Sequence, residues 1–371
     1  MSTTNVLDAL VVGAGPAGIG TALALAAVDD LTFGVLERGR IGQTFLEWPA
    51  AQTFLTPSFT GNGFGATDLN AVHPETSPAF SLGVDYPTGP QYAKYLRSVA
   101  AYFRVPILDE TDVTGVQRHD EGFEVQCARG PVLARTLVWA GGEFHQPNDP
   151  RLSGAGLCDA ARTPQAWEDR DGRVLVIGGY ESGVDIACHH VERGATVTVV
   201  DAQTPWDAGS GSDPSFRLAP RSRARFTAAR ETGRLHLIAA DARRVTRDDD
   251  TWVTSLDNGT RVSADSRPIA ATGYGPGLGP TEHLFHRRDD GWPEVDEDDQ
   301  STLTPDLFLS GPSLRHGGLK FCFVYKFRQR FAHVAGVIGR RLGKDVGALE
   351  AWRSAGMLTD DLSCCDVECA C

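Results

Sequence analysis

The residues most able to do chemistry stand at the end of the chain, where the sequence reads SCCDVECAC. Paired thiols can carry two electrons as a disulfide, and a thiolate attacks another disulfide through a mixed-disulfide intermediate. The same grouping suits soft thiophilic ions such as Cu(I), Zn, Hg or arsenite. A solvated tail with incidental thiols, or one that attaches a partner, also stays open. The four tail cysteines, half of the eight in the chain, are Cys364, Cys365, Cys369 and Cys371.

Two carboxylates, Asp366 and Glu368, stand among these thiols. Negative charge nearby disfavours the thiolate, which is the nucleophilic form. We therefore expect the tail to react best when it docks against positive charge. Arg315, His316 and the basic stretch 326–330 could supply that charge, in the same subunit or in a neighbouring one.

A glycine-rich loop near the start of the chain has the composition of a phosphate cradle: residues 13–18 read GAGPAG. In such a loop, Gly13 makes the tight turn, Gly15 lets the backbone approach a pyrophosphate, and Gly18 lets the following helix pack closely. The free N–H groups at the helix start then attract the phosphates. The other loop residues expected to line a cofactor are Pro16 and Ala17.

The residues around this loop complete a dinucleotide-binding pattern. An apolar, β-branched stretch at 5–12 predicts a strand before the loop, and an alanine- and leucine-rich stretch at 19–27 predicts a helix after it. A second predicted strand, 31–36, ends in Glu37, at the position where a carboxylate binds a ribose diol. A glycine turn in some other α/β unit is the alternative, but the complete pattern favours a nucleotide.

The same pattern returns in the middle of the chain. Residues 173–193 read as a strand, the loop GGYESG and a helix, and a further strand at 196–200 ends in Asp201. Tyr180 stands where the second glycine of the motif is usual, so we expect this site to hold its dinucleotide more loosely or somewhat displaced. The residues expected to contact this second dinucleotide are Gly178, Gly179, Glu181, Ser182, Gly183, Asp201 and Gly273.

A hairpin-like strand pair follows each copy, and the turn Asp257-Asn258-Gly259 in the second pair predicts a type I′ hairpin. Two copies of one unit imply an α/β chain with two Rossmann-like dinucleotide-binding domains, the second inserted in the first. The chain returns to the first domain at 304–311, before a predicted helix at 323–341. The predicted domains are 1–168 with 274–356, the inserted 169–273, and the cysteine-rich tail 357–371.

The composition limits the partners. The formal net charge is −13, and a surface of this sign repels phosphate backbones, so nucleic acid is an unexpected partner. The sequence has no run of eighteen apolar residues and no basic leader before its first strand, so we expect neither a membrane span nor a signal peptide. These features favour the cytoplasm, where thiols stay reduced and cysteine clusters are more often catalytic or metal-binding.

Two dinucleotide sites in one chain predict electron transfer between two cofactors, usually a nicotinamide that arrives and leaves and a flavin that stays. The first domain is the better candidate for FAD, because the chain returns to it at 304–311.

At this point the sequence resembles a known family. Its plan is similar to that of the thioredoxin-reductase-like and flavin-monooxygenase-like two-domain flavoproteins. It most closely resembles the bacillithiol disulfide reductase group, through GGYESG, GPSLRH at 311–316 and YKFRQRF at 325–331, within a similarity that runs over most of 5–342. This resemblance implies FAD in the first domain, a nicotinamide in the second, and reduction of a thiol-derived substrate. It adds four expected cofactor contacts, Arg38, Val113, Gly311 and Lys326.

The resemblance also implies that the helix at 323–341 directs its N-terminus to the flavin, where Lys326, Arg328 or Arg330 could add positive charge. The alternative for these three residues is ordinary surface or inter-subunit ion pairing. A homodimer is expected from similar reductases.

The departures from the family pattern are informative. Members of the bacillithiol group carry a cysteine in the first glycine loop, where this chain has Ala17, and thioredoxin reductases carry a CxxC in the inserted domain that is absent here. The stretch 152–167 lacks the histidine of the monooxygenase motif FxGxxxHxxxW. Pro312 replaces the aspartate that binds the ribityl chain of FAD, so another group must hold that hydroxyl.

The choice between NADH and NADPH depends on Asp201. A carboxylate there accepts bonds from both ribose hydroxyls and repels a 2′-phosphate, and the following AQTPW offers no arginine. The residues therefore favour NADH, although the resembling reductases generally use NADPH. A solvated loop carboxylate is the alternative for Asp201.

Four cysteines lie outside the tail. Cys127, Cys158 and Cys188 are expected to be small apolar packing residues or loop residues. Cys322 precedes the predicted helix at 323–341, and a helix start can lower a thiol pKa, so a redox role and a packing role both stay open.

These observations predict a flavin-dependent NAD(P)H oxidoreductase that passes electrons from nicotinamide through FAD to the tail thiols, and then to a small disulfide or other thiol-derived substrate. The alternatives are a flavin monooxygenase or oxidase, and a protein that uses the tail to reduce or bind a metal or metalloid.

Overall fold

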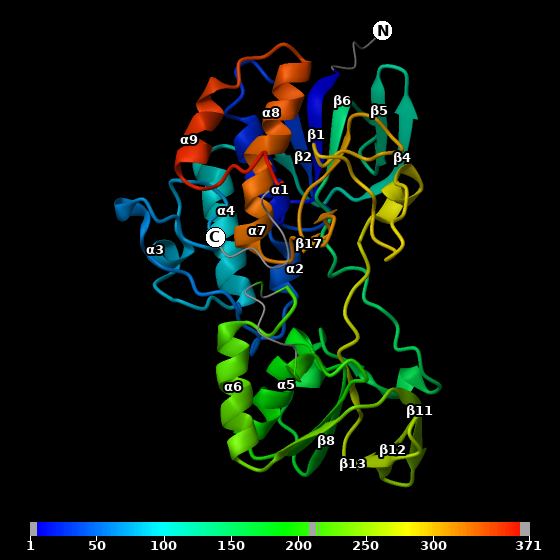
Figure 1. Ribbon diagram of the computed structural model, residues 1–371. Helices are drawn as coiled ribbons and strands as arrows, with labels where there is room; N and C mark the ends of the chain where they lie inside the picture. The colour runs from blue at the N-terminus through cyan, green and yellow to red at the C-terminus, as the bar shows by residue number, and fades with distance from the viewer. Residues whose placement is uncertain (1–5, 208–212, 214, 364–371) are drawn as a thin grey trace. The chain divides into compact units, whose positions relative to one another are not determined.

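The computed structural model describes residues 6–207, 213 and 215–363, which form two units (Figure 1). The outer unit contains residues 6–47, 56–146 and 275–363, and the inserted unit contains 48–55 and the described residues of 147–274. The chain is therefore mixed α/β, with the second unit inserted in the first, as the sequence predicts.

The borders of the inserted unit lie outside the 169–273 expected from the sequence. Residues 147–168 contact this unit because β7 (Asp159–Ala160) pairs in parallel with β14 (Ile269–Ala270) and extends the same sheet. The polar composition of the segment gives no sign of this pairing.

The outer unit is built on a seven-stranded sheet in which β1 lies between β2 and β6. The strand order is β3-β2-β1-β6-β5-β4, and the returning strand β15 also pairs with β6. The strands β1, β2, β3, β6 and β15 pair in parallel, whereas β4, β5 and the start of β6 form an antiparallel meander. The bounds are β1 Leu7–Val12, β2 Phe33–Leu36, β3 Ile107–Leu108, β4 Val113–His119, β5 Gly122–Cys127, β6 Val132–Trp139 and β15 Leu307–Leu309.

Two helices of the outer unit pack closely on each other, as Figure 1 shows for α1 and α8. A Cβ added to Gly20 of α1 would lie 1.9 Å from the ring of Phe331 in α8, so only glycine permits this approach. The longest helix, α4, begins with a capping box between Thr88 and Gln91. The bounds are α1 Pro16–Leu25, α2 Gln43–Leu46, α3 Pro78–Leu82, α4 Gly89–Tyr102, α7 Val324–Phe327, α8 Phe331–Arg341 and α9 Glu350–Ser354.

The inserted unit has a parallel sheet of order β10-β9-β8-β14-β7. Helix α5 lies between this sheet and α6 (Figure 1), and its buried face packs on apolar side chains of β8 and β9. A separate antiparallel sheet, β11-β12-β13, follows. The bounds are β8 Arg173–Ile177, β9 Thr196–Val200, β10 Leu235–Ile238, β11 Ala242–Asp248, β12 Thr251–Leu256, β13 Arg261–Ala264, α5 Glu181–Glu192 and α6 Pro220–Glu231.

The hairpin predicted between β12 and β13 is present, but its turn is not type I′. Only Gly259 has a positive φ, +84°, whereas a type I′ turn needs one at Asn258 as well. The N–H of Leu256 donates to the carbonyl of Thr260 at 2.8 Å, which leaves three residues in the loop, with glycine in the left-handed position. The sequence was wrong about the turn because both loop lengths use an Asn-Gly pair.

In the described part of the chain, no helix is long and apolar enough to cross a membrane. The remaining strands of the outer unit, β16 (Arg315–His316) and β17 (Leu319–Lys320), pair as a short antiparallel hairpin. This hairpin leads from the returning strand β15 to α7.

Candidate dinucleotide-binding sites

The first glycine loop connects β1 to α1 and requires glycine at two places. Gly13 has φ +107°, and a Cβ there would lie 2.4 Å from the carbonyl oxygen of Ala140. A Cβ on Gly18 would lie 1.8 Å from the carbonyl oxygen of Gly13. The loop therefore lies too close to the end of β6 and to the first turn of α1 for any side chain at these two positions.

The middle of this loop is open. A Cβ on Gly15 would meet no protein atom within 4 Å, although Gly15 caps a ten-residue helix that starts at Pro16. The unbonded N–H groups of the first helical turn are a ready site for a diphosphate, and bare backbone at Gly15 leaves room for it. The cradle therefore fits the pyrophosphate of a dinucleotide.

A buried carboxylate closes the loop. Glu37, at the end of β2, accepts the N–H of Ala14 at 2.6 Å on one oxygen and the N–H of Gly39 at 2.8 Å on the other. Each oxygen keeps a lone pair for a ribose hydroxyl. Of the other expected contacts, Val113 is buried at the start of β4, and Arg38 lies near His145.

The loop between β8 and α5 repeats this geometry in the inserted unit. Gly178 has φ +102°, and its Cβ would lie 2.3 Å from the carbonyl oxygen of Ala271; a Cβ on Gly183 would lie 1.9 Å from the carbonyl oxygen of Gly178. Asp201 accepts the N–H groups of Gly179 and Gln203, each at 2.8 Å, as Glu37 does at its own positions. The two loops are built alike, contact by contact.

The two loops differ in what covers them. The hydroxyl of Tyr180 donates to the carbonyl of Arg217 at 3.0 Å, so a side chain crosses the place where Gly15 leaves the first loop bare. A Cβ on Gly179 would lie 2.2 Å from the indole of Trp206, which therefore rests directly on the loop. Trp206 was not predicted, because nothing in its local sequence shows where the turn after β9 folds back.

A cavity of about 270 Å³ opens beside this second loop, at the carboxyl end of β14. It brings together Ser182, at the start of α5, and Gly273, two residues that the sequence assigns to the same nucleotide. It lies where the strand order turns back between β8 and β14, the usual place for a ligand in an open α/β sheet. Polar groups on its wall come from Asn148, Asp149, Cys158, Arg162, Ser182 and Thr272.

The returning segment of the outer unit lies against the first glycine loop. Gly311 has φ +116°, and its Cβ would lie 3.1 Å from Cβ of Ala17, while the hydroxyls of Ser310 and Thr21 are 3.0 Å apart. Ala17 and Gly311, which the sequence assigns to one cofactor, are therefore neighbours at the start of α1. Pro312 follows and has no N–H to offer a cofactor.

Close to this segment lies a charged group that sequence reasoning missed. Burial raises the pKa of Glu143 to about 7, and Arg315 opposes this rise. Burial lowers the pKa of Arg315, and the nearby Cys322 and Glu143 oppose this by raising it. The Arg315 guanidinium also lies over the ring of Trp292, 3.9 Å from its centre. The available signal was an acidic residue in the short loop after the buried strand β6, four residues beyond Trp139.

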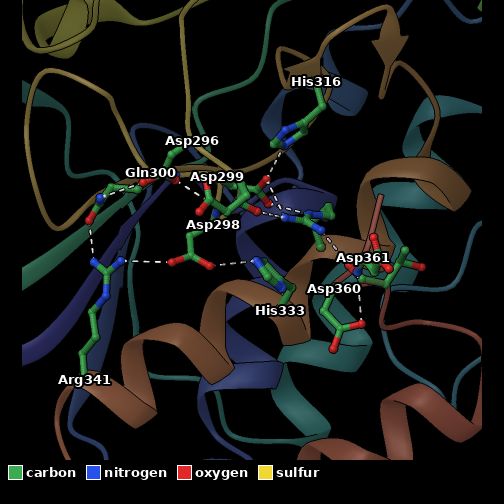
Figure 2. A network of polar contacts seen from close by, with 12 residues as sticks. Asp296, Asp298, Asp299, Gln300, His316, His333, Arg341, Asp360 and Asp361 are labelled. Atoms are coloured by element: carbon green, nitrogen blue, oxygen red, sulfur yellow. Dashed lines mark hydrogen bonds and ion pairs between the residues drawn. The ribbon is translucent and has the colours of Figure 1, made fainter. Parts of the chain in front are cut away.

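The basic residues after β17 are mostly engaged in the protein core. Arg328 is buried and donates to the carbonyls of Asp68 and Ala71. Arg330 makes a paired contact with Asp299, at 2.8 and 2.9 Å, and His316 joins the same carboxylate at 2.6 Å (Figure 2). Arg328 and Arg330 therefore hold the fold of the outer unit, and Lys326 stays a predicted cofactor contact.

The cysteines of the described chain are dispersed. Burial raises the pKa of Cys188 to about 12 and of Cys158 to about 11, while the thiol of Cys127 donates to the carbonyl of Gly130. In the ranges that the structure covers, no group of three or more His, Cys, Asp or Glu could hold a metal ion. Cys364, Cys365, Cys369 and Cys371 lie outside the described residues.

Known proteins resemble this arrangement. The profile of the family described as pyridine nucleotide-disulphide oxidoreductase matches residues 10–311. An uncharacterised CzcO-like oxidoreductase of Geobacillus kaustophilus is 29% identical over 192 residues, 49% of this chain and 51% of that protein. The bacilliredoxin reductase Bdr of Bacillus subtilis is 22% identical over 346 residues, 90% of this chain and 98% of that protein.

Among solved structures, the bacillithiol disulfide reductase Bdr (YpdA) of Staphylococcus aureus has a TM-score of 0.73 at 19% identity, covering 91% of this chain and 99% of that one. This similarity shows the fold. The chain spans about half the length of the CzcO-like oxidoreductase, 51%, and the match to Bdr spans nearly the whole of both proteins.

Proposed function

We propose that this chain, which belongs to the pyridine nucleotide-disulphide oxidoreductase family, passes electrons from a nicotinamide through FAD to its own thiols and on to a small disulfide or other thiol-derived substrate. The family uses FAD and a nicotinamide cofactor, and the chain is accordingly an FAD-dependent oxidoreductase. The observation that carries the proposal is the duplicated loop: the same four backbone and carboxylate contacts recur in both units.

The outer unit suits FAD. Its loop is bare at Gly15, Glu37 has a lone pair for a ribose hydroxyl on each oxygen, and Gly311 brings the returning chain to Ala17. When bound, FAD takes up two electrons from the nicotinamide and returns them to an acceptor. The N–H groups at the start of α1 bind the diphosphate, and the packing of α1 on α8 keeps that helix start in place.

The inserted unit suits a nicotinamide nucleotide, and Asp201 favours NADH. Its carboxylate stands at the end of β9, where it accepts ribose hydroxyls and repels a 2′-phosphate. The cavity beside Ser182 and Gly273 is large enough for a nicotinamide ring and its ribose.

Cys322 is the described cysteine for which the sequence leaves a redox role open. The β16–β17 hairpin turns the chain back, so that Cys322 lies close enough to the Arg315 guanidinium to act on its charge. Arg315 in turn follows Gly311 by four residues. A cation beside a thiol favours its thiolate, and the Glu143 carboxyl can exchange a proton near neutral pH.

The chain segment that leads to the tail contacts Gln329 and Arg330, the residues just before α8. Arg330 donates to the carbonyl of Thr359 at 2.7 Å, and the N–H of Thr359 donates to the carbonyl of Gln329 at 3.0 Å. Cys364 follows Thr359 by five positions, so even a fully extended chain carries its Cα no farther than about 18 Å from that anchor.

A tail dithiol would reduce a disulfide by two exchanges. One thiolate attacks the substrate and releases a first thiol, and the second thiolate resolves the mixed disulfide and releases the second thiol. The protein disulfide left behind is reopened by the two electrons that the nicotinamide supplies. A homodimer, which could pair tail and site between subunits, is part of the same proposal.

The test is truncation after Leu362, followed by anaerobic NADH titration of oxidised protein. We expect the full-length protein to take up two equivalents, one for flavin and one for a disulfide, and the truncated protein to take up one. Turnover with small disulfides should fall with the truncation. Uptake of a single equivalent by the full-length protein overturns the thiol relay while leaving the flavoprotein intact.

A flavin monooxygenase or oxidase is the second candidate, favoured by Ala17, which replaces the cysteine expected beside a disulfide reductase flavin. This reading predicts NADH oxidation that consumes oxygen at a rate the truncation does not change. A metal- or metalloid-binding role of the tail predicts instead a purified protein that holds Zn or Cu(I) through the four tail thiols.

A further inference from the structure

Three parallel strands of the outer unit end beside its glycine loop. Val12, at the end of β1, pairs with Trp139 of β6, and Trp139 pairs with Leu309 of β15. The N–H of Ser310 then donates to the carbonyl of Trp139 at 2.9 Å, and the next residue is Gly311. This register brings Gly311 to the start of α1.

The inserted unit repeats this register strand for strand. Ile177, at the end of β8, pairs with Ala270 of β14, and Ala270 pairs with Ala160 of β7. The N–H of Ala161 donates to the carbonyl of Ala270, again at 2.9 Å, and the next residue is Arg162. Arg162 therefore has the position in the inserted unit that the returning glycine has in the outer unit.

The first turns of the two helices correspond in the same way. The glycine loops are built from the same contacts, so Ser182 stands where Ala17 stands in the outer loop, four residues after the first glycine. In the outer unit, a Cβ on Gly311 would lie 3.1 Å from Cβ of Ala17. The equivalent pair in the inserted unit is Arg162 with Ser182, and both residues line the cavity of about 270 Å³ beside the loop. The cavity thus joins the two residues that the register makes neighbours.

Arg162 brings an uncompensated positive charge to this cavity. In the part of the chain that the structure describes, its guanidinium makes no ion pair, whereas Arg170 and Arg267 both pair with Asp159, at 2.7 and 2.8 Å. Ser182 lies in the first turn of the twelve-residue helix α5, where N–H groups and the helix dipole favour a phosphate. A guanidinium offers paired donors that match phosphate oxygens. The two sides of the cavity therefore suit the same anion.

We infer that Arg162 binds the phosphate of the nicotinamide half of the dinucleotide, together with the start of α5. This inference rests on the proposed function, because it takes the inserted unit as the nicotinamide site. Tyr180 stands where the outer loop offers bare backbone to a diphosphate, and the charge of Arg162 supplies an additional contact. Because the guanidinium binds the phosphate and not the ring, it adds affinity for every nicotinamide ligand that carries this phosphate.

The experiment compares NAD⁺, nicotinamide mononucleotide and nicotinamide riboside by titration calorimetry on the purified oxidised flavoprotein. The last two ligands differ only in the phosphate. Arg162→Gln is expected to weaken binding of NAD⁺ and of the mononucleotide by roughly tenfold to a hundredfold, the usual effect of losing a hydrogen bond to a charged group. Binding of the riboside should stay within about twofold. Arg193→Gln removes the same charge from an exposed ion pair at the other end of α5 and should change none of the three.

A second measurement is the second-order rate constant of anaerobic flavin reduction by the three reduced ligands, which is measurable even for a ligand that binds weakly. It should fall in Arg162→Gln for the two phosphate-bearing ligands and not for the riboside. Arg162→Lys keeps the charge without the paired donors, so its losses should be smaller than those of Arg162→Gln.

Equal losses for the riboside and the mononucleotide, or no loss for any ligand, would overturn the inference, because Arg162 would then not bind the phosphate. A wild-type protein that binds none of the three ligands, and whose flavin none of the reduced ligands bleaches, would contradict the proposed nicotinamide site itself, and the inference would fall with it.

Discussion

Gly15 and Gly18 stand three residues apart in one loop, yet a methyl group on each has a different consequence. On Gly18 it would lie 1.8 Å from a backbone carbonyl, whereas on Gly15, at φ −78°, it would meet no protein atom within 4 Å. We expect Gly18→Ala to lower the melting temperature of the flavin-free protein. Gly15→Ala should leave that temperature unchanged and weaken FAD binding, because its methyl group stands in the path of the diphosphate. Equal melting temperatures, or unchanged FAD affinity in Gly15→Ala, would contradict this.

Asp201 should set the choice of nucleotide. Asp201→Asn removes the charge that repels a 2′-phosphate and keeps an oxygen for the N–H of Gly179. We expect the ratio of kcat/KM for NADPH to that for NADH to rise by about tenfold, corresponding to about 1.4 kcal/mol. Asp207→Asn removes the same charge from an exposed position on the same turn and should change the ratio little. A wild-type protein that prefers NADPH would contradict the argument.

Glu143 should make stability depend on pH. Its folded pKa, about 7, lies above the value of 4.5 expected in the unfolded chain, so between these values the unfolded state loses its proton first. Stability therefore falls as pH rises from about 4.5 to about 7, by up to about 3 kcal/mol for this one group. Glu143→Gln lacks the effect, so it should gain stability relative to wild type between pH 4 and pH 8. Parallel melting curves over that range would contradict the assignment.

The residues that sequence reasoning missed share one physical property: their role depends on the tertiary fold. Trp206 lies in a loop without a motif, and only the fold of the turn after β9 puts its indole on Gly179. The pKa of Glu143 is raised by burial in the folded chain, and Arg315, far along the sequence, opposes that rise. The glycine loops were predictable because their residues act within one short turn.

At the level of elements, a buried ion pair links the loop before β15 to the residue before α8 (Figure 2). The adjacent ion pair is much more exposed to solvent. Asp299 is fully buried against Arg330, whereas the adjacent Asp298 is 32% exposed and bonds Arg341 at 3.1 Å. Asp299→Asn leaves the guanidinium buried without a counter-charge, and we expect a loss of about 3 kcal/mol in unfolding free energy.

Asp298→Asn is the matched control and should cost less than about 1 kcal/mol, as exposed pairs do. Asparagine also tolerates the left-handed backbone of Asp299, φ +64°, so the expected loss reports the charge and not the backbone. Chemical denaturation of the two variants beside the wild type measures both values, and similar losses would contradict the account.

Elements with strong local patterns were predictable to within a few residues. The strand expected at 31–36 is observed as β2 at Phe33–Leu36, and the helix expected at 323–341 is observed as α7, a short 3-10 turn and α8. The turn type predicted at Asn258 was wrong. Loop length sets the turn type, and the pairing of the two strands decides the loop length.

At the level of the whole molecule, the repeated pattern was sufficient to predict two Rossmann-like units with one inserted in the other. The border between the units at 146/147 could not be predicted from that pattern. Residues 147–168 join the inserted unit through a two-residue strand, which has no apolar pattern of its own. The duplicated carboxylate caps, Glu37 on Ala14 and Asp201 on Gly179, show that the repeat extends to single hydrogen bonds.

The most direct test of the division of labour between the units uses one equivalent change in each. A Cβ on Gly18 would lie 1.8 Å from the carbonyl of Gly13, and a Cβ on Gly183 would lie 1.9 Å from that of Gly178, so both alanine variants distort matching loops. Flavin content and anaerobic bleaching by NADH and by dithionite are measured on each. The account predicts that Gly18→Ala loses FAD, while Gly183→Ala stays yellow, bleaches with dithionite and no longer bleaches with NADH. A colourless Gly183→Ala beside a yellow Gly18→Ala would contradict it.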